Sequence, residues 1–140
     1  MCKQMDNDLL KCILACNGDK FTPTEVDKVF MYVKNYCHFS AHAAGRALNI
    51  CSDVAVIDVL TGNYVSATNL KQPFLIGPDT QYIQAYPKLV NKGMFRVPQI
   101  FVHSPTGWQY IGGSDDFDKL IDRRNTNVQT IQSMFDQVKF

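Results

Sequence analysis

The sequence predicts an α/β fold in which a small mixed β-sheet is flanked by helices. Two β-branched and aromatic runs, 29–33 and 54–59, are typical of buried strands, and the Ala-rich stretch 39–50 between them has a helical pattern. A helical crossover of this kind joins parallel strands. The runs 99–103 and 108–111 are separated by a Pro- and Gly-containing turn, which predicts an antiparallel hairpin. A parallel unit followed by a hairpin gives a mixed sheet with helices on both faces.

The other helices are predicted from their start and stop residues and from apolar spacing. Acidic residues open the helix at 6–16, and Asn17-Gly18 closes it. Two glycines precede the helix at 115–123, and the helix at 126–140 repeats apolar residues at helical intervals. We expect Pro87 to interrupt or restart the helix at 80–91. These helices cover residues 6–16, 80–91, 115–123 and 126–140.

Length and composition indicate one globular domain over residues 1–140. The segment 60–78 contains several Gly and Pro residues and predicts a long irregular insertion, with a short ordered piece near 74–76. Hydrophobic residues make up 46% and charged residues 19%, which argues against disorder. The composition is therefore that of one folded domain, with extra helices predicted at its N- and C-terminal ends.

Charge and hydropathy exclude several partners. A formal charge of +1 gives no electrostatic basis for binding nucleic acid or an anionic membrane surface. No apolar run reaches the roughly 18–20 residues that a membrane span needs. The first residues lack the apolar stretch of a signal peptide, so we expect a cytoplasmic protein in a reducing compartment.

The five cysteines form neither a disulfide framework nor a metal site. Their number is odd, none has C-x-x-C spacing, and Cys12-x3-Cys16 lacks a second Cys/His pair. Cys37 differs because it follows a predicted strand and precedes a predicted helix. Helix N-termini favour a thiolate, and Lys34 adds positive charge, so Cys37 is a candidate nucleophile. The alternative is an ordinary half-buried cysteine at a strand end.

Two further stretches carry a signal, each with a simpler alternative. Pro98 follows Val97 just before a strand, where a cis peptide costs little, although it would equally begin an edge strand. Gly112-Gly113 precede a helix with Asp115 in its first turn. That arrangement suits an anion at the backbone N–H groups or an ammonium at the carboxylate, but it also describes a plain turn with an Asp cap.

Taken together, these stretches resemble the glutaredoxins, which have the thioredoxin-like fold. The resemblance spans roughly residues 28–123, and its glycine-containing segment is distinctive of glutaredoxins. The matching pieces are the strand-Lys-x-x-Cys run 29–40, the cis-proline segment 97–101 and the Gly-Gly-x-Asp-Asp segment 111–116.

The resemblance implies that Cys37 attacks and forms a mixed disulfide with glutathione. Lys34 would pair with a glutathione carboxylate, and Phe39 would line the groove. The family's dithiol motif is Cys-Pro-Tyr-Cys, whereas Cys37-His38-Phe39-Ser40 has no second thiol. Cys51 lies about 20 Å further along the predicted helix, too far to resolve the intermediate. The resemblance therefore favours a monothiol route, in which a second glutathione resolves the mixed disulfide on Cys37.

The same resemblance implies the remaining contacts to glutathione. Val97, beside the expected cis Pro98, would offer its backbone groups to the cysteinyl unit. Ser114 and Asp115 would hold the γ-glutamyl end, with the Asp115 carboxylate facing the ammonium. The expected partners are glutathione and a glutathionylated or disulfide-bearing protein, and the chain would act as a monomer or weak homodimer.

Two rival functions stay open at the level of sequence. Cys-x-Phe-Ser also resembles the Cys-Gly-Phe-Ser monothiol glutaredoxins, which are associated with a [2Fe–2S] cluster shared by two monomers; His38 replaces their Gly. The second rival is a catalytically poor thioredoxin-fold module that binds a protein partner through the insertion or the ends of the chain.

Overall fold

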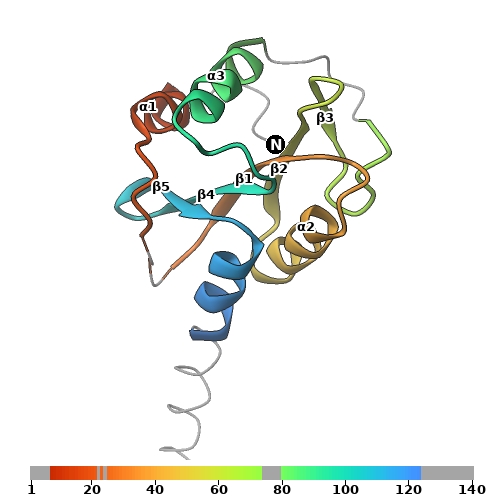
Figure 1. Ribbon diagram of the computed structural model, residues 1–140. Coiled ribbons are helices and arrows are strands. Elements are labelled where there is room, and N and C mark those ends of the chain that lie inside the picture. Colours follow the sequence, from red (N-terminus) through yellow and green to blue (C-terminus); the bar gives the residue numbers. More distant parts are fainter. Residues whose placement is uncertain (1–6, 22, 24, 74–79, 124–140) are drawn as a thin grey trace, which may run out of the picture.

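The computed structural model describes residues 7–21, 23, 25–73 and 80–123. A fourth helix covers 114–123 within this part of the chain. The other elements, shown in Figure 1, are α1 (Asn7–Ala15), β1 (Lys28–Val33), α2 (His38–Ile50), β2 (Asp53–Asp58), β3 (Asn63–Val65), α3 (Thr80–Asn91), β4 (Gln99–Ser104) and β5 (Gly107–Gly112).

The strands form one mixed sheet in the order β3-β2-β1-β4-β5. β1 and β2 are parallel, with Lys28 opposite Asp53, and α2 is the crossover between them. β4 runs antiparallel to β1 and pairs with β5 across a tight hairpin turn that Gly107 closes with φ of +108°. The α/β class and the mixed sheet are confirmed, and the arrangement is compatible with a thioredoxin-like fold.

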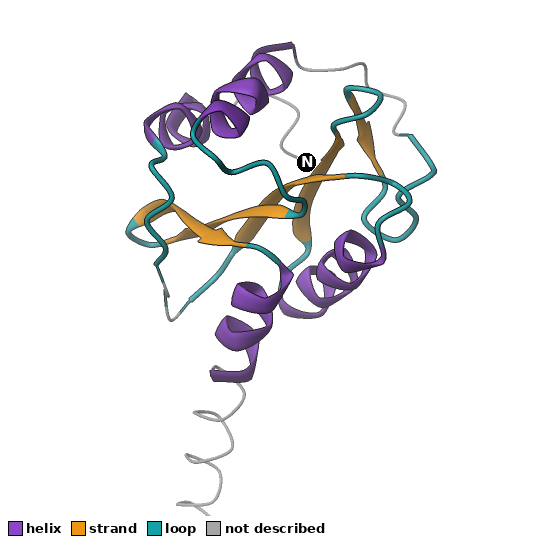
Figure 2. Ribbon diagram, in the orientation of Figure 1, coloured by secondary structure: helices purple, strands orange, loops and turns teal. Residues whose placement is uncertain are grey.

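The sheet has a helical layer on each face, because side chains alternate along the strands. Figure 2 shows α1 and α3 together on one face, with α2 and helix 114–123 on the other. One core packs Val29, Met31 and Val33 of β1 against α2 and helix 114–123. The other packs Phe30 and Tyr32 against α1 and α3. The central strand β1 is therefore buried on both faces of the sheet. This packing holds in place its C-terminal end at Val33, which precedes Cys37.

The insertion and the proline differ from what the sequence predicts. Segment 60–78 is not wholly irregular: β3 pairs with β2, and Val65 bridges to Pro73. Pro87 does not interrupt α3, which is continuous. Tyr82, Ala85 and Leu89 are buried on one side of α3, so packing holds the helix across the hydrogen bond that proline removes.

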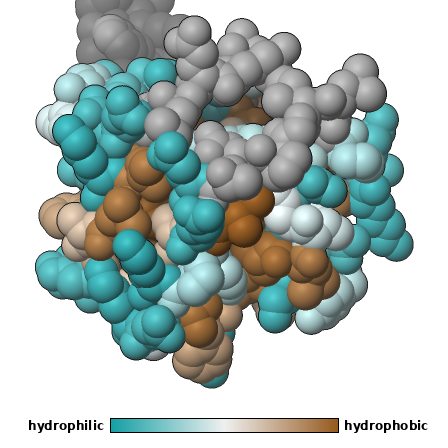
Figure 3. Space-filling view, turned by 90° about the horizontal axis from the view of Figure 1, so that it is seen from above, coloured by the Kyte–Doolittle hydropathy of each residue, from teal (hydrophilic) through white to brown (hydrophobic). Residues whose placement is uncertain are grey.

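The other predicted elements occur within a residue or so of their expected bounds. The predicted ordered piece at 74–76 and the predicted helix at 126–140 lie outside the described residues. No helix in the described ranges has the length and apolar character to span a bilayer. The face over α1 and α3 mixes hydrophilic and hydrophobic side chains (Figure 3), with Leu14 and Val90 among the exposed apolar ones.

Candidate functional site

Cys37 lies at the connection between the central strand β1 and helix α2. β1 ends at Val33, and a turn in which the Cys37 N–H donates to the Lys34 carbonyl (3.1 Å) leads to the helix. Cys37 is the N-cap residue of α2, in extended conformation, and its side chain makes no capping hydrogen bond. The half-buried thiol therefore lies at the N-terminus of a 13-residue helix, at the junction that the sequence predicts.

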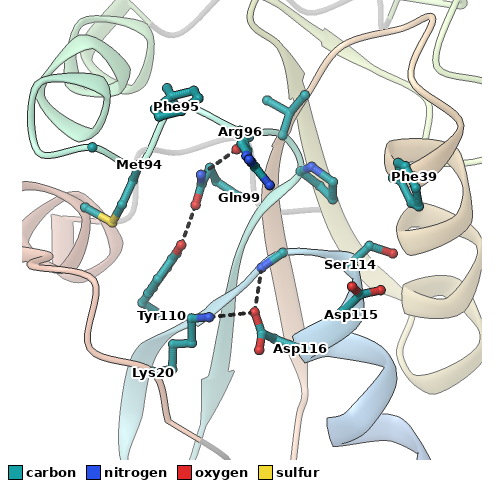
Figure 4. Close-up of a pocket in the computed structure, with 14 residues that line it drawn as sticks. Lys20, Phe39, Met94, Phe95, Arg96, Gln99, Tyr110, Ser114, Asp115 and Asp116 are labelled. Atoms are coloured by element: carbon teal, nitrogen blue, oxygen red, sulfur yellow. Dashed lines mark hydrogen bonds and ion pairs between the residues drawn. The ribbon is translucent and has the colours of Figure 1, made fainter.

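A groove of about 490 Å³ opens beside this junction. Most of its walls come from three segments that are distant in the sequence: the first turn of α2, the loop 93–98 before β4, and residues 113–116 at the start of helix 114–123 (Figure 4). Of the predicted site residues, those that line it are Phe39, Val97, Pro98, Ser114 and Asp115. Cys37 and Lys34 do not line the groove. Phe39, which does, is two residues after Cys37 in the chain.

The groove residues differ in exposure. Phe39 is 51% exposed and Asp115 is also exposed, whereas Ser114 is only 7% exposed and its side chain faces the cavity. The Val97–Pro98 peptide bond is cis, as the sequence predicts. The groove thus combines an exposed aromatic side chain with a nearly buried hydroxyl and an exposed carboxylate.

An ion pair closes the end of the groove away from Cys37. The Lys20 ammonium is 2.9 Å from Oδ2 of Asp116, and the same oxygen accepts the Gly113 N–H at 3.3 Å. Lys20 follows α1, and the neighbouring Phe21 N–H donates to the Tyr110 carbonyl at 3.0 Å. The segment after α1, which precedes residues 28–123, therefore supplies part of the groove. No local sequence pattern points to Lys20, because 96 residues separate it from Asp116.

Buried polar side chains hold the loop that carries Arg96. Tyr110 donates its hydroxyl to Oε1 of Gln99, which is only 4% exposed, and the Gln99 amide donates to the Arg96 carbonyl. Burial, with smaller effects of Cys16 and Asp116, raises the pKa of Tyr110 to about 12, so its hydroxyl stays a donor at neutral pH. Gln99 and Tyr110 line the groove but lack any local sequence signal.

Ser40 lies three residues after Cys37, in the first turn of α2. Its side chain is fully buried in α2, and its Oγ has no hydrogen-bond partner within the described part of the chain. An unpaired buried hydroxyl costs free energy, which hydrophobic packing around it must offset. A serine here provides no sulfur to close a disulfide with Cys37.

The other described cysteines do not line the groove, although Cys16 Sγ is 3.8 Å from Sδ of Met94, which does. Cys12 and Cys16 belong to the core under α1 and α3, and burial raises the pKa of Cys12 to about 11 and also raises that of Cys16. Cys51 caps the far end of α2. The described residues contain no group of three or more His, Cys, Asp or Glu side chains placed to hold a metal ion.

These positions limit how a [2Fe–2S] cluster would be held. Such a cluster takes four ligands, usually thiolates. Cys37 is the one described thiol beside the groove, so one copy of the chain fits at most one ligand position. The described residues fit a cluster only if a second copy and glutathione supply the others.

Comparison with protein-family models, with curated proteins and with solved structures found no match to this chain. What the chain does is therefore inferred from its own residues and their geometry.

Proposed function

We propose that this protein is a glutathione-dependent thiol–disulfide oxidoreductase that reduces protein–glutathione mixed disulfides by a monothiol route. The observation that carries the proposal is the assembly of Phe39, Val97 and Ser114 into one groove at the N-terminus of the helix that Cys37 caps. The strand order β2-β1-β4-β5, with only β1 and β2 parallel, supports a thioredoxin-like arrangement.

The chemistry needs only thiols and one disulfide. The Cys37 thiolate attacks the glutathione sulfur of the mixed disulfide, and the substrate protein leaves as a thiolate that takes up a proton. The thiolate of a second glutathione attacks the glutathione sulfur on Cys37. Cys37 is thereby released as thiolate, and the product is oxidised glutathione. The first N–H groups of α2 favour negative charge on the leaving Cys37 sulfur.

The position of Ser40 supports the monothiol route over an intramolecular one. Cys51 is at the opposite end of α2 from Cys37, 14 residues along the chain. At 1.5 Å per residue this is about 20 Å, against the roughly 7 Å limit between Cα atoms of a disulfide. Among the other described cysteines, Cys12 and Cys16 belong to the core under α1 and α3, which further favours resolution by a second thiol molecule.

The test is an intact-mass measurement of the reduced protein after incubation with oxidised glutathione. We expect a single glutathionyl adduct that forms quickly, reverses with free glutathione and disappears in Cys37→Ser. The matched control Cys51→Ser should form the adduct like the natural chain. An adduct that persists in Cys37→Ser, or none at all, would contradict the proposal and favour a partner-binding module.

A further inference from the structure

The charges that line the groove are balanced. The two cations are Lys20 and Arg96, and the two carboxylates are Asp115 and Asp116. Lys20 is already paired with Asp116 at 2.9 Å. Among the described residues, neither Arg96 nor Asp115 takes part in an ion pair, and both are exposed. The groove therefore presents one unpaired cation and one unpaired carboxylate.

These two charges lie on different walls. Arg96 projects from the loop before β4, and Asp115 lies in the first turn of helix 114–123 (Figure 4). The Arg96 backbone is anchored through its carbonyl, which accepts the amide of buried Gln99. Its guanidinium extends from that anchored point toward the end of the groove where Asp115 and Asp116 lie (Figure 4).

A ligand that satisfies both charges carries a carboxylate and an ammonium. The hydroxyl of Ser114, a nearly buried residue, also lines the groove beside Asp115 (Figure 4), so it adds a neutral donor there. A dianion such as a phosphate group is disfavoured, because the unpaired Asp115 carboxylate would repel it and Arg96 alone would have to neutralise it. An α-amino acid group meets these conditions.

We infer that Arg96 is a specificity-determining residue, which binds the α-carboxylate of a ligand's terminal amino acid group while Asp115 faces its ammonium. This rests on the proposed function, in which that group is the γ-glutamyl end of glutathione. Lys20 is a positioning residue: its ammonium neutralises Asp116, which would otherwise repel the ligand carboxylate. A planar guanidinium suits this task because it pairs with a carboxylate through two parallel hydrogen bonds.

The test separates binding from chemistry by using S-methylglutathione, which cannot form a disulfide. Calorimetric titration of the reduced protein compares this ligand with an analogue whose γ-glutamyl α-carboxylate is an amide. The analogue should bind the natural chain about fivefold more weakly, the upper range for an exposed ion pair. Arg96→Met should bind S-methylglutathione about fivefold more weakly and lose nothing further with the analogue.

Three further variants are compared with the same two ligands. Arg96→Lys should restore part of the difference between the two ligands, because the charge returns without the planar fork. Lys20→Met should weaken S-methylglutathione more than the amide. Lys119→Met removes an exposed charge outside the groove and should change neither affinity.

Equal losses for the two ligands in Arg96→Met, or no loss at all, would overturn the inference. So would a natural chain that does not distinguish the carboxylate from the amide. The proposed function fails separately, if no adduct forms on Cys37 although the ligand binds. An adduct on Cys37 together with no coupling at Arg96 would leave the function standing and remove this inference.

Discussion

Gly112 and Gly113 are neighbours in the sequence, yet the structure predicts opposite responses to Gly→Ala. Gly112 has φ of +118°, and an added Cβ would lie 2.4 Å from Oδ2 of Asp116. Gly113 has no such φ, and its added Cβ would meet the Pro98 carbonyl oxygen at an ordinary 3.7 Å. Gly112→Ala should therefore destabilise the fold and disturb the closed end of the groove, whereas Gly113→Ala should fold normally.

The expected size follows from two contributions. Forcing a residue with a Cβ into the Gly112 conformation costs about 1–3 kcal/mol. The Asp116 carboxylate must also move from Lys20, and an ion pair this exposed contributes about 0.5 kcal/mol. We expect the free energy of unfolding to fall by about 2–3 kcal/mol, which for a chain of this size lowers Tm by about 6–9 °C.

Urea unfolding followed by the fluorescence of the single tryptophan, Trp108, measures this difference. Trp108 is in β5, the strand that ends at Gly112, so it reports on the affected hairpin. Gly113→Ala is the matched control and should stay within about 0.5 kcal/mol of the natural chain. Equal losses in the two variants, or a change below about 0.5 kcal/mol in Gly112→Ala, would refute the reasoning from backbone conformation.

Three other predictions concern α2 and the buried ionisable groups. Ser40→Cys places a thiol three residues after Cys37, within the roughly 4.4–6.8 Å Cα separation of a disulfide, so mild oxidation should remove two hydrogens in an intact-mass measurement; an unchanged mass would contradict the placement of Ser40. Gly45→Ala should raise the free energy of unfolding by about 1 kcal/mol, because the added Cβ meets nothing within 4 Å on this exposed helix position; a loss in urea unfolding would show an unseen contact. Burial raises the pKa of Cys12 from 9.0 to about 11 and that of Tyr110 from 10.0 to about 12. The folded state holds these protons more tightly than the unfolded one, so stability should be fully present below about pH 9 and fall as the pH rises toward 12, with a shallower fall in Cys12→Ser; stability that rises over this range would reverse the sign.

Local sequence patterns were sufficient for most of the fold. Runs of β-branched and aromatic residues locate the strands, and the Pro-Thr-Gly turn after Ser104 sets the hairpin, because both signals come from near neighbours in the chain. The short strand β3 escaped prediction because its three residues form a strand only when β2 lies beside them. The continuity of α3 through Pro87 likewise depends on packing against the sheet.

The α/β order of elements, the placement of Cys37 at a strand-to-helix junction and the lack of a thiol at Ser40 can all be read from the amino-acid sequence. The ion pair between Lys20 and Asp116, and the groove that Arg96 shares with Asp115, become visible only in the folded chain. A helix start or a turn is set by residues a few positions apart, whereas the charge balance of a groove is set by side chains from distant segments that folding brings together.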